Sequence, residues 1–117
     1  MTASQFGFAL YMTESQGNHE AWGDGGCAVG LYQVHAAWLF EHANKYHVAP
    51  LVDERFNDWV ARVVSAFYSD WSRTLPQLEV AMFFHRGHQV PPASDEWDGE
   101  YANRFARYAA LATAITR

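Results

Sequence analysis

The sequence predicts a single, mainly α-helical domain that carries one small glycine-rich loop or hairpin lobe. Apolar residues recur at helical spacing through most of the chain, and outside the glycine-rich stretch no segment alternates convincingly with a period of two. A chain of 117 residues, of which 50% are hydrophobic, is long enough to bury one core but too short for two ordinary domains. One domain is therefore expected over residues 1–117.

The first predicted helix leads directly into the glycine-rich segment. Phe6, Leu10 and Tyr11 form the apolar pattern of a short buried helix that ends between Met12 and Ser15. Residues 16–30 then contain five glycines, a composition typical of backbone that turns tightly or approaches something closely. Because long loops inside a compact domain are usually functional, this segment is the first place to look for a site.

Two helices are predicted in the middle of the chain. The first covers Val34 to Tyr46, and Pro50 prevents its continuation. The second is long, and Asp53 is a good N-cap for it. Its apolar positions at helical spacing are Phe56, Trp59, Val60, Val63, Val64 and Phe67.

Two further helices complete the prediction. Thr74 and Gln77 form a capping-box pattern that opens a buried helix, which ends near Gly87. Residues 90–95 are expected to form a loop, and the last helix is expected to start near Asp98. Its apolar positions are Tyr101, Phe105, Tyr108, Leu111, Ala112 and Ile115.

The charge and hydropathy of the chain argue against nucleic acid and membranes as partners. The formal net charge is −5, and the eight Lys and Arg residues are scattered, so no cationic stripe is present to neutralise phosphates. No apolar run approaches the roughly 18 residues that span a bilayer. The first ten residues lack the basic and apolar regions of a signal peptide. We expect a monomer without membrane insertion and without a nucleic-acid partner.

Cysteine and metal chemistry is not predicted. Cys27 is the only cysteine, which excludes an intramolecular disulfide, and it is expected to be a small buried apolar residue. His85 and His88 lie three residues apart and invite a zinc hypothesis, but no glutamate motif of a metallohydrolase accompanies them. We therefore expect neither a metal site nor a cofactor.

Two acidic residues have the placement that glycoside hydrolysis requires. Glu14 stands at the end of the first predicted helix, and Asp24 lies in the glycine-rich loop that this helix end faces. Such a reaction needs one carboxyl group to protonate the leaving oxygen and another to activate water or stabilise positive charge. The acid must hold a proton at the working pH, and burial against aromatic residues favours the protonated form of a carboxyl group.

Several short motifs follow one another in a recognisable order. They are Glu14-Ser15, Trp22-Gly23-Asp24, Gly30-Leu31-Tyr32-Gln33-Val34, Phe84-His85-Arg86-Gly87 and Glu100-Tyr101-Ala102-Asn103-Arg104-Phe105. In this order they resemble the lysozyme-like superfamily, specifically the goose-type lysozymes and the soluble lytic transglycosylases. In those families a glutamate and a serine end a helix, Gly-Leu-Met-Gln follows a glycine-rich segment, and Tyr-Asn-x-Gly precedes a carboxy-terminal tyrosine helix.

The resemblance implies a lysozyme-like (α+β) fold and a peptidoglycan glycan strand as the partner. Glu14 would be the general acid that protonates the oxygen between N-acetylmuramic acid and N-acetylglucosamine, and Asp24 would position water on the opposite face of the sugar. The residues implied to contact substrate are Ser15, Tyr32, Gln33, His35, His85 and Tyr101. The candidates for a sugar-stacking platform are Trp22, Trp38, Trp71 and Trp97.

The chain also departs from the family pattern. Phe84 and His85 replace the tyrosine and asparagine of one motif, Tyr32 replaces a methionine, and His35 stands where many goose-type enzymes carry another aspartate. A ring nitrogen of His35 or His85 is therefore a candidate for handling water. The interpretations left open are a hydrolase, a lytic transglycosylase that forms 1,6-anhydro ends, and a catalytically silent wall-binding, inhibitory or assembly module. A small chain of this kind would suit a bacteriophage lysis or virion-associated protein that acts at the bacterial cell wall.

Overall fold

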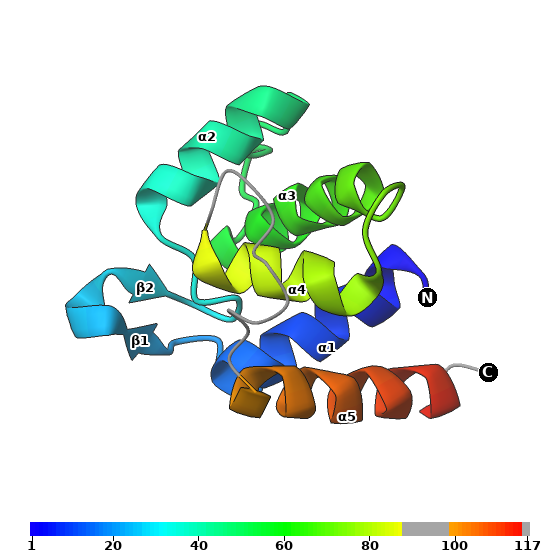
Figure 1. The fold of residues 1–117 in the computed structure, drawn as a ribbon. Coiled ribbons are helices and arrows are strands. Elements are labelled where there is room, and N and C mark those ends of the chain that lie inside the picture. The colour runs from blue at the N-terminus through cyan, green and yellow to red at the C-terminus, as the bar shows by residue number, and fades with distance from the viewer. Residues whose placement is uncertain (88–98, 116–117) are drawn as a thin grey trace.

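The computed structural model describes residues 1–87 and 99–115. These residues form five α-helices and one β-hairpin, which are joined by loops (Figure 1). The helices are α1 (Ala3–Ser15), α2 (Ala36–Tyr46), α3 (Phe56–Trp71), α4 (Gln77–Arg86) and α5 (Gly99–Ile115). The hairpin pairs β1 (Trp22–Gly23) with β2 (Ala28–Val29) in antiparallel orientation around a 3₁₀ turn, η1 (Asp24–Gly26). The mainly α class is confirmed, and the glycine-rich lobe contains a small hairpin.

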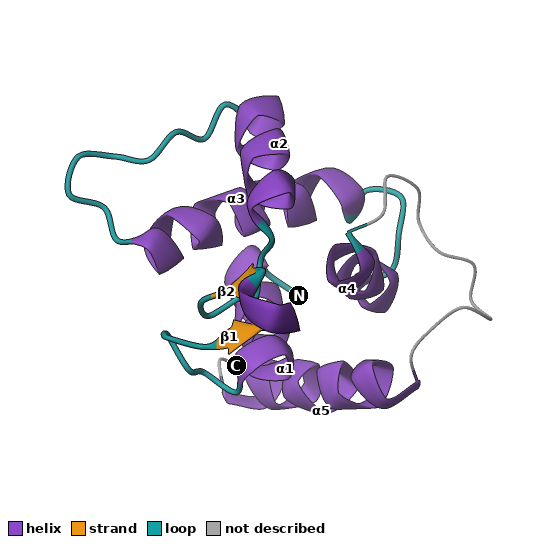
Figure 2. Ribbon diagram, turned by 90° about the vertical axis from the view of Figure 1, so that its left-hand side faces the viewer, coloured by secondary structure: helices purple, strands orange, loops and turns teal. Residues whose placement is uncertain are grey.

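Helix α1 packs along two other helices. It packs against α5 and α3, while α2 packs against α3 and α4 against α5 (Figures 1 and 2). The hairpin follows the C-terminal end of α1, so this helix end lies where the lobe and the helices meet. Among the described residues, no helix is long and apolar enough to cross a membrane.

Aromatic rings from three helices form the centre of the core. Phe6 of α1 is fully buried and stacks on Tyr68 of α3 with ring centroids 4.3 Å apart. Its ring also lies 5.7 Å from that of Phe105 of α5. Aromatic pairs of this kind contribute about 0.5–1.5 kcal/mol beyond the area they bury. Two residues of the predicted apolar face of α3 are not fully buried: Phe56 is 42% exposed, and Trp59 is half-buried.

Two predicted helix starts lie too early in the sequence. Val34 forms a bridge with Val29 of the hairpin, so α2 begins two residues later, at Ala36. Asp53 has a left-handed backbone (φ 63°) and is not an N-cap, because α3 begins only at Phe56. An isolated capping residue is a weak signal when the surrounding loop forms a turn of its own.

The predicted capping box at α4 is also wrong, and a capping box occurs elsewhere. Pro76 precedes α4 without any side-chain cap, and the Thr74 hydroxyl donates to the Trp71 carbonyl at 3.5 Å. At α1, by contrast, the Thr2 hydroxyl accepts from the backbone N–H of Gln5, and the Gln5 side chain accepts from that of Thr2. Both boxes have the same residue spacing, so only the local backbone distinguishes them.

The predicted C-terminal ends of α1 and α4 agree with the structure better than the predicted helix starts do. Helix α1 ends at Ser15, within the predicted range, and Gln16 beyond it takes a left-handed conformation (φ 56°). Helix α4 ends at Arg86, and Gly87 has the left-handed backbone that glycine adopts without strain (φ 63°). The predicted loop at 90–95 and the predicted start near Asp98 lie outside the described residues. Cys27, expected to be buried, is exposed.

The lobe is fastened to the helices by Asn57 of α3. Its Oδ1 accepts from the backbone N–H of Leu31 at 3.0 Å, and its Nδ2 donates to the carbonyl of His19 at 3.0 Å. Gly30 adopts a left-handed conformation (φ 79°), and a Cβ at this position would lie 2.6 Å from Oδ1 of Asn57. The close approach of the lobe to α3 therefore requires glycine at residue 30.

Substitution of Gly30 with alanine is expected to lower the free energy of unfolding by about 3 kcal/mol, because left-handed strain and a collision with Asn57 act together. Gly25→Ala is the matched control, since Gly25 also has a positive φ (67°) but nothing lies within 4 Å of an added Cβ. The control should lose about 1 kcal/mol. Urea unfolding checks both values, and equal losses would show that the contact with Asn57 does not restrict residue 30.

The segment between α2 and α3 is closed by a carboxylate–guanidinium pair. Glu54 accepts from Nε and Nη2 of Arg62 at 2.8 and 2.7 Å, and it also accepts from the backbone N–H of Leu51 at 3.0 Å. The hydrogen bonds from Arg62 and from Leu51 lower the pKa of Glu54 from its ordinary value of 4.5 to about 2. The ionised form of Glu54 thus helps to hold this loop.

Acid is expected to remove this contribution in a defined pH window. Because the folded-state pKa is depressed, the stabilisation is present above pH 4.5 and is lost as the pH falls towards 2. Glu54→Gln should therefore flatten the dependence of the unfolding midpoint on pH across that window. Glu20→Gln, at an exposed position in the loop after α1, should retain the wild-type slope.

Candidate active site

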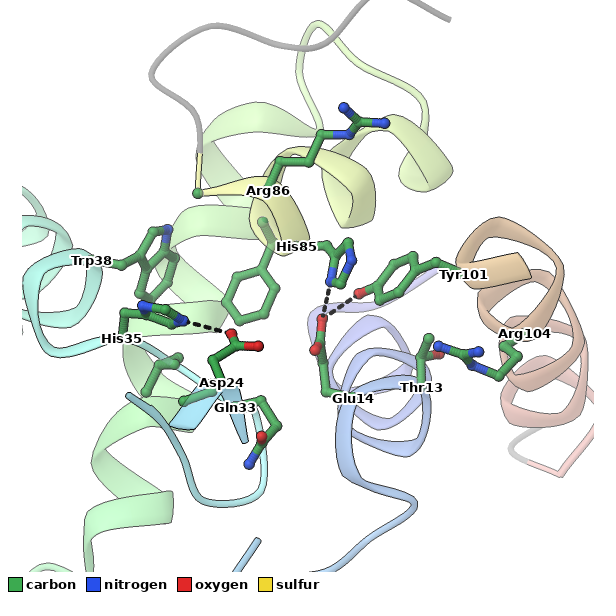
Figure 3. Close-up of a pocket in the computed structure, with 14 residues that line it drawn as sticks. Thr13, Glu14, Asp24, Gln33, His35, Trp38, His85, Arg86, Tyr101 and Arg104 are labelled. Atoms are coloured by element: carbon green, nitrogen blue, oxygen red, sulfur yellow. Dashed lines mark hydrogen bonds and ion pairs between the residues drawn. The ribbon is translucent and has the colours of Figure 1, made fainter. Parts of the chain in front are cut away.

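Glu14 is held at the end of α1 by partners from two other helices. Its side chain is only 9% exposed. The hydroxyl of Tyr101 on α5 donates to Oε2 at 2.6 Å, and Nδ1 of His85 on α4 lies 3.2 Å from the same oxygen (Figure 3). No hydrogen bond to Oε1 occurs within the described residues, so one oxygen of this sequestered carboxyl group is anchored and the other is available.

Tyr101 is the buried anchor of this arrangement. The residue is 1% exposed, and the ring of His85 stacks on it with centroids 3.9 Å apart. The Arg104 guanidinium lies over the Tyr101 ring at 5.9 Å. Burial, followed by the neighbouring Glu14 carboxylate, raises the pKa of Tyr101 well above its ordinary value of 10. The phenol therefore stays protonated and remains a donor to Glu14 throughout the physiological range.

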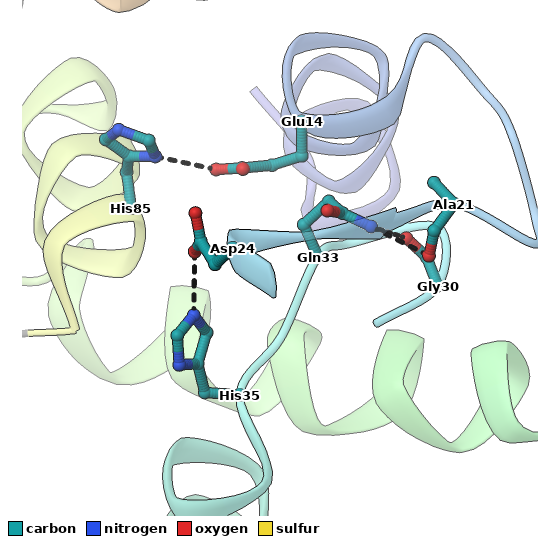
Figure 4. Close-up of polar contacts among 7 residues, drawn as sticks. All are labelled: Glu14, Ala21, Asp24, Gly30, Gln33, His35 and His85. Carbon is teal, nitrogen blue, oxygen red and sulfur yellow. Dashed lines mark hydrogen bonds and ion pairs between the residues drawn. The ribbon is translucent and has the colours of Figure 1, made fainter. Parts of the chain in front are cut away.

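Asp24 belongs to the hairpin lobe and forms a second carboxylate–imidazole pair. It begins the turn η1 with a left-handed backbone (φ 50°), and its Oδ2 lies 2.9 Å from Nε2 of His35. The side chains are far more exposed than Glu14, at 70% for Asp24 and 50% for His35. Figures 3 and 4 both show the other oxygen of Asp24 pointing towards the side of Glu14.

A cavity of about 320 Å³ separates the two pairs. Glu14 and His85 line one wall, and Asp24 and His35 line another (Figure 4). Its remaining lining residues are Thr13, Ala28, Gln33, Val34, Trp38, Phe84, Arg86, Gly87, Tyr101 and Arg104. The structure thus brings Glu14, Asp24, Gln33, His35, His85 and Tyr101 together around one cavity.

Two predicted substrate contacts lie elsewhere. The Ser15 hydroxyl donates to the carbonyl of Leu31 at 2.6 Å, so it ties the end of α1 to the lobe. Tyr32 is 5% exposed and packs edge-to-face against Tyr11 with centroids 5.7 Å apart. Burial raises the pKa of Tyr32 to about 12. Neither Ser15 nor Tyr32 lines the cavity.

Gln33 lines the cavity but is already engaged by the backbone of the lobe. Its Nε2 donates to the carbonyls of Ala21 and Gly30 at 3.0 and 2.9 Å (Figure 4). Its own backbone is left-handed (φ 50°), which turns the chain out of the hairpin towards Val34. Gln33 therefore shapes the lobe with its amide nitrogen, and only the rest of its side chain is left to meet a ligand.

The four candidate stacking tryptophans separate clearly. Trp38 of α2 lines the cavity, with its ring centroid 4.9 Å from that of Phe84. Trp22 is 70% exposed but does not line the cavity, and Trp71 packs edge-to-face on Phe83 in the core. Trp97 lies outside the described residues, as does His88, the second histidine of the zinc hypothesis. Of the candidate tryptophans within the described residues, Trp38 is therefore the one that lines the cavity.

Two arginines that sequence reasoning did not single out also line the cavity. Arg104 donates to Glu100 at 2.8 Å, and Nε of Arg86 is buried with no hydrogen-bond partner among the described residues. Arg104 could have been predicted from helical spacing, because it stands three residues after Tyr101 and therefore lies on the same face of α5. Arg86 offers no comparable signal, since its motif position is variable in the family pattern.

Comparison with known proteins found no family model, no curated protein and no solved structure that matches the chain.

Removal of the Tyr101 hydroxyl tests the anchoring of Glu14. Tyr101→Phe is expected to lower the free energy of unfolding by about 1–3 kcal/mol, because a nearly buried carboxyl group loses a short hydrogen bond. In a Glu14→Ala background the same substitution should cost less than it does in the wild type, since the hydroxyl has lost this acceptor. Urea denaturation of the four proteins gives the coupling, and strict additivity would contradict a stabilising Tyr101–Glu14 interaction.

Proposed function

We propose that this protein cleaves the β-1,4 bond between N-acetylmuramic acid and N-acetylglucosamine in peptidoglycan, with Glu14 as the general acid. The observation that carries the proposal is the Glu14 carboxyl group, 9% exposed and anchored by Tyr101, in a cavity that holds a second carboxylate. Most glycoside hydrolases use two carboxyl groups, and different environments, one shielded and one solvated, suit them to separate roles. Glu14 and Asp24 have these two environments.

The anchoring of Glu14 suits proton donation from Oε1. Tyr101 and His85 both contact Oε2, and a carboxyl group that accepts hydrogen bonds at one oxygen can carry its proton on the other. Oε1 would protonate the glycosidic oxygen as the bond from that oxygen to the sugar C1 breaks.

Asp24 would serve the other half of the reaction. Water attacks C1 from the face opposite the leaving group, and its proton passes to the Asp24 carboxylate, so that the elements of water are added across the broken bond. This route inverts the configuration at C1. Asp24 is well placed for it because its side chain is 70% exposed and lines the same cavity as Glu14.

The mainly helical fold with a small hairpin is compatible with a lysozyme-like architecture. A helical domain with a small hairpin after a glutamate-terminated helix matches what the motif order implies. The contacts of the motif residues support this assignment further, since the serine after Glu14 and the Gly-Leu-Tyr-Gln turn are joined by the hydrogen bond from Ser15 to Leu31. We therefore propose that the domain is lysozyme-like.

Glu14→Gln is expected to reduce release of products from purified peptidoglycan by about 100-fold or more, because a positioned general acid contributes roughly 10²–10⁴ in rate. Glu20→Gln, an exposed glutamate outside the cavity, is the control and should act like the wild type. Mass spectrometry of the products measures release and identifies the new chain ends.

The nature of those ends distinguishes the related activities. Reducing ends would indicate hydrolysis, and 1,6-anhydro ends would indicate a lytic transglycosylase, which requires Glu14 but not Asp24. Binding to peptidoglycan without release would indicate a silent wall-binding module. Equal release by wild type and Glu14→Gln would overturn the role proposed for Glu14.

A further inference from the structure

We propose that His35 is a positioning residue for Asp24, so that the Asp24–His35 pair acts as one unit that handles water in the cavity. This inference rests on the proposed function and assigns to His35 a task that substrate contact alone would not require. Its basis is the distance of 2.9 Å between Nε2 of His35 and Oδ2 of Asp24. With an ionised Asp24, which only accepts hydrogen bonds, the donor in this contact is Nε2 of His35.

The Asp24 side chain needs such a partner to have one orientation. It is 70% exposed and stands on a turn of three residues, and the contact with His35 is its only side-chain hydrogen bond within the described part of the chain. An exposed aspartate without a partner samples several rotamers. A general base, by contrast, must stay within hydrogen-bond reach of the water that it activates.

The position of His35 is fixed by the lobe that carries Asp24. Val34, the residue before it, exchanges two backbone hydrogen bonds with Val29 of the hairpin, at 3.0 and 3.2 Å. His35 itself has an extended backbone (φ −88°, ψ 145°) immediately before α2, and its side chain makes no capping bond to that helix. Its ring is therefore placed by the hairpin and left available to Asp24.

The pairing gives the two carboxylate oxygens of Asp24 different roles. Oδ2 is occupied by His35, and the other oxygen, Oδ1, points towards the side of the cavity where Glu14 lies (Figures 3 and 4). Oδ1 is then the atom that receives the proton of the attacking water while Oδ2 remains bonded to His35. The neighbouring Glu14 has the same arrangement, with Oε2 held by Tyr101 and His85.

Four variants test the pairing on soluble peptidoglycan fragments of defined length. Asp24→Asn should lower kcat by about 100-fold or more, as expected for loss of a general base. His35→Ala should lower kcat by about tenfold with little change in KM, because misplacement of a reacting group affects the chemical step. His35→Gln, whose amide can still donate to Asp24, should recover most of the loss. The double variant Asp24→Asn/His35→Ala should be no slower than Asp24→Asn alone.

The matched control is His19→Ala, at an exposed histidine outside the cavity, which should keep the wild-type kcat. Circular dichroism and urea unfolding compare the fold of every variant. If Glu14→Gln abolishes release while His35→Ala keeps the wild-type kcat, the pairing is overturned and the proposed function stands. A His35→Gln variant as slow as His35→Ala would also contradict positioning through a donated hydrogen bond. Release that is unaffected by Glu14→Gln overturns both proposals.

Discussion

Burial of the Glu14 carboxyl group is the constraint on which the arrangement of the helices depends. A carboxyl group at 9% exposure requires hydrogen-bond donors, because removal from water without partners is costly. Tyr101 supplies one from α5 and His85 lies beside it on α4, so both helices must approach the end of α1. The ring of His85 stacks on that of Tyr101, so the two partners of Glu14 also pack on each other. The packing of α1 against α5 thus serves the site as well as the core.

The lobe opposite this support is built from polar side chains that bind backbone. Ser15, Gln33 and Asn57 each hydrogen bond to main-chain groups of the lobe, at distances between 2.6 and 3.0 Å. A two-stranded hairpin has little apolar surface of its own and is marginal in isolation. These hydrogen bonds stabilise a lobe that has no apolar core of its own, and they attach the segment that carries Asp24 to the helical part of the domain.

The sequence predicted the elements better than it predicted their caps. Helical periodicity located the helices, because burial of one helix face requires apolar residues at that spacing. Asp53 is not a cap, because it has a left-handed backbone in the loop that Glu54 and Arg62 hold together. Motif order placed Glu14, Asp24 and Tyr101 around one cavity. It misplaced Tyr32, since a motif position does not reveal which face of a turn is buried. Asn57 has no local signal at all, because its partners, His19 and Leu31, lie far away in the sequence.

The contacts of Glu14 also have a consequence for the order of folding. His85 and Tyr101 lie 71 and 87 residues after Glu14 in the chain, so the surroundings of the acid are assembled by contacts of very long sequence separation. Such contacts form only after the entropy of closing long loops has been overcome, and they slow folding. During synthesis, α1 and the hairpin emerge before α4 and α5, and Glu14 then has neither of these partners. A nascent chain therefore carries Glu14 long before it carries the side chains that surround this residue in the folded domain.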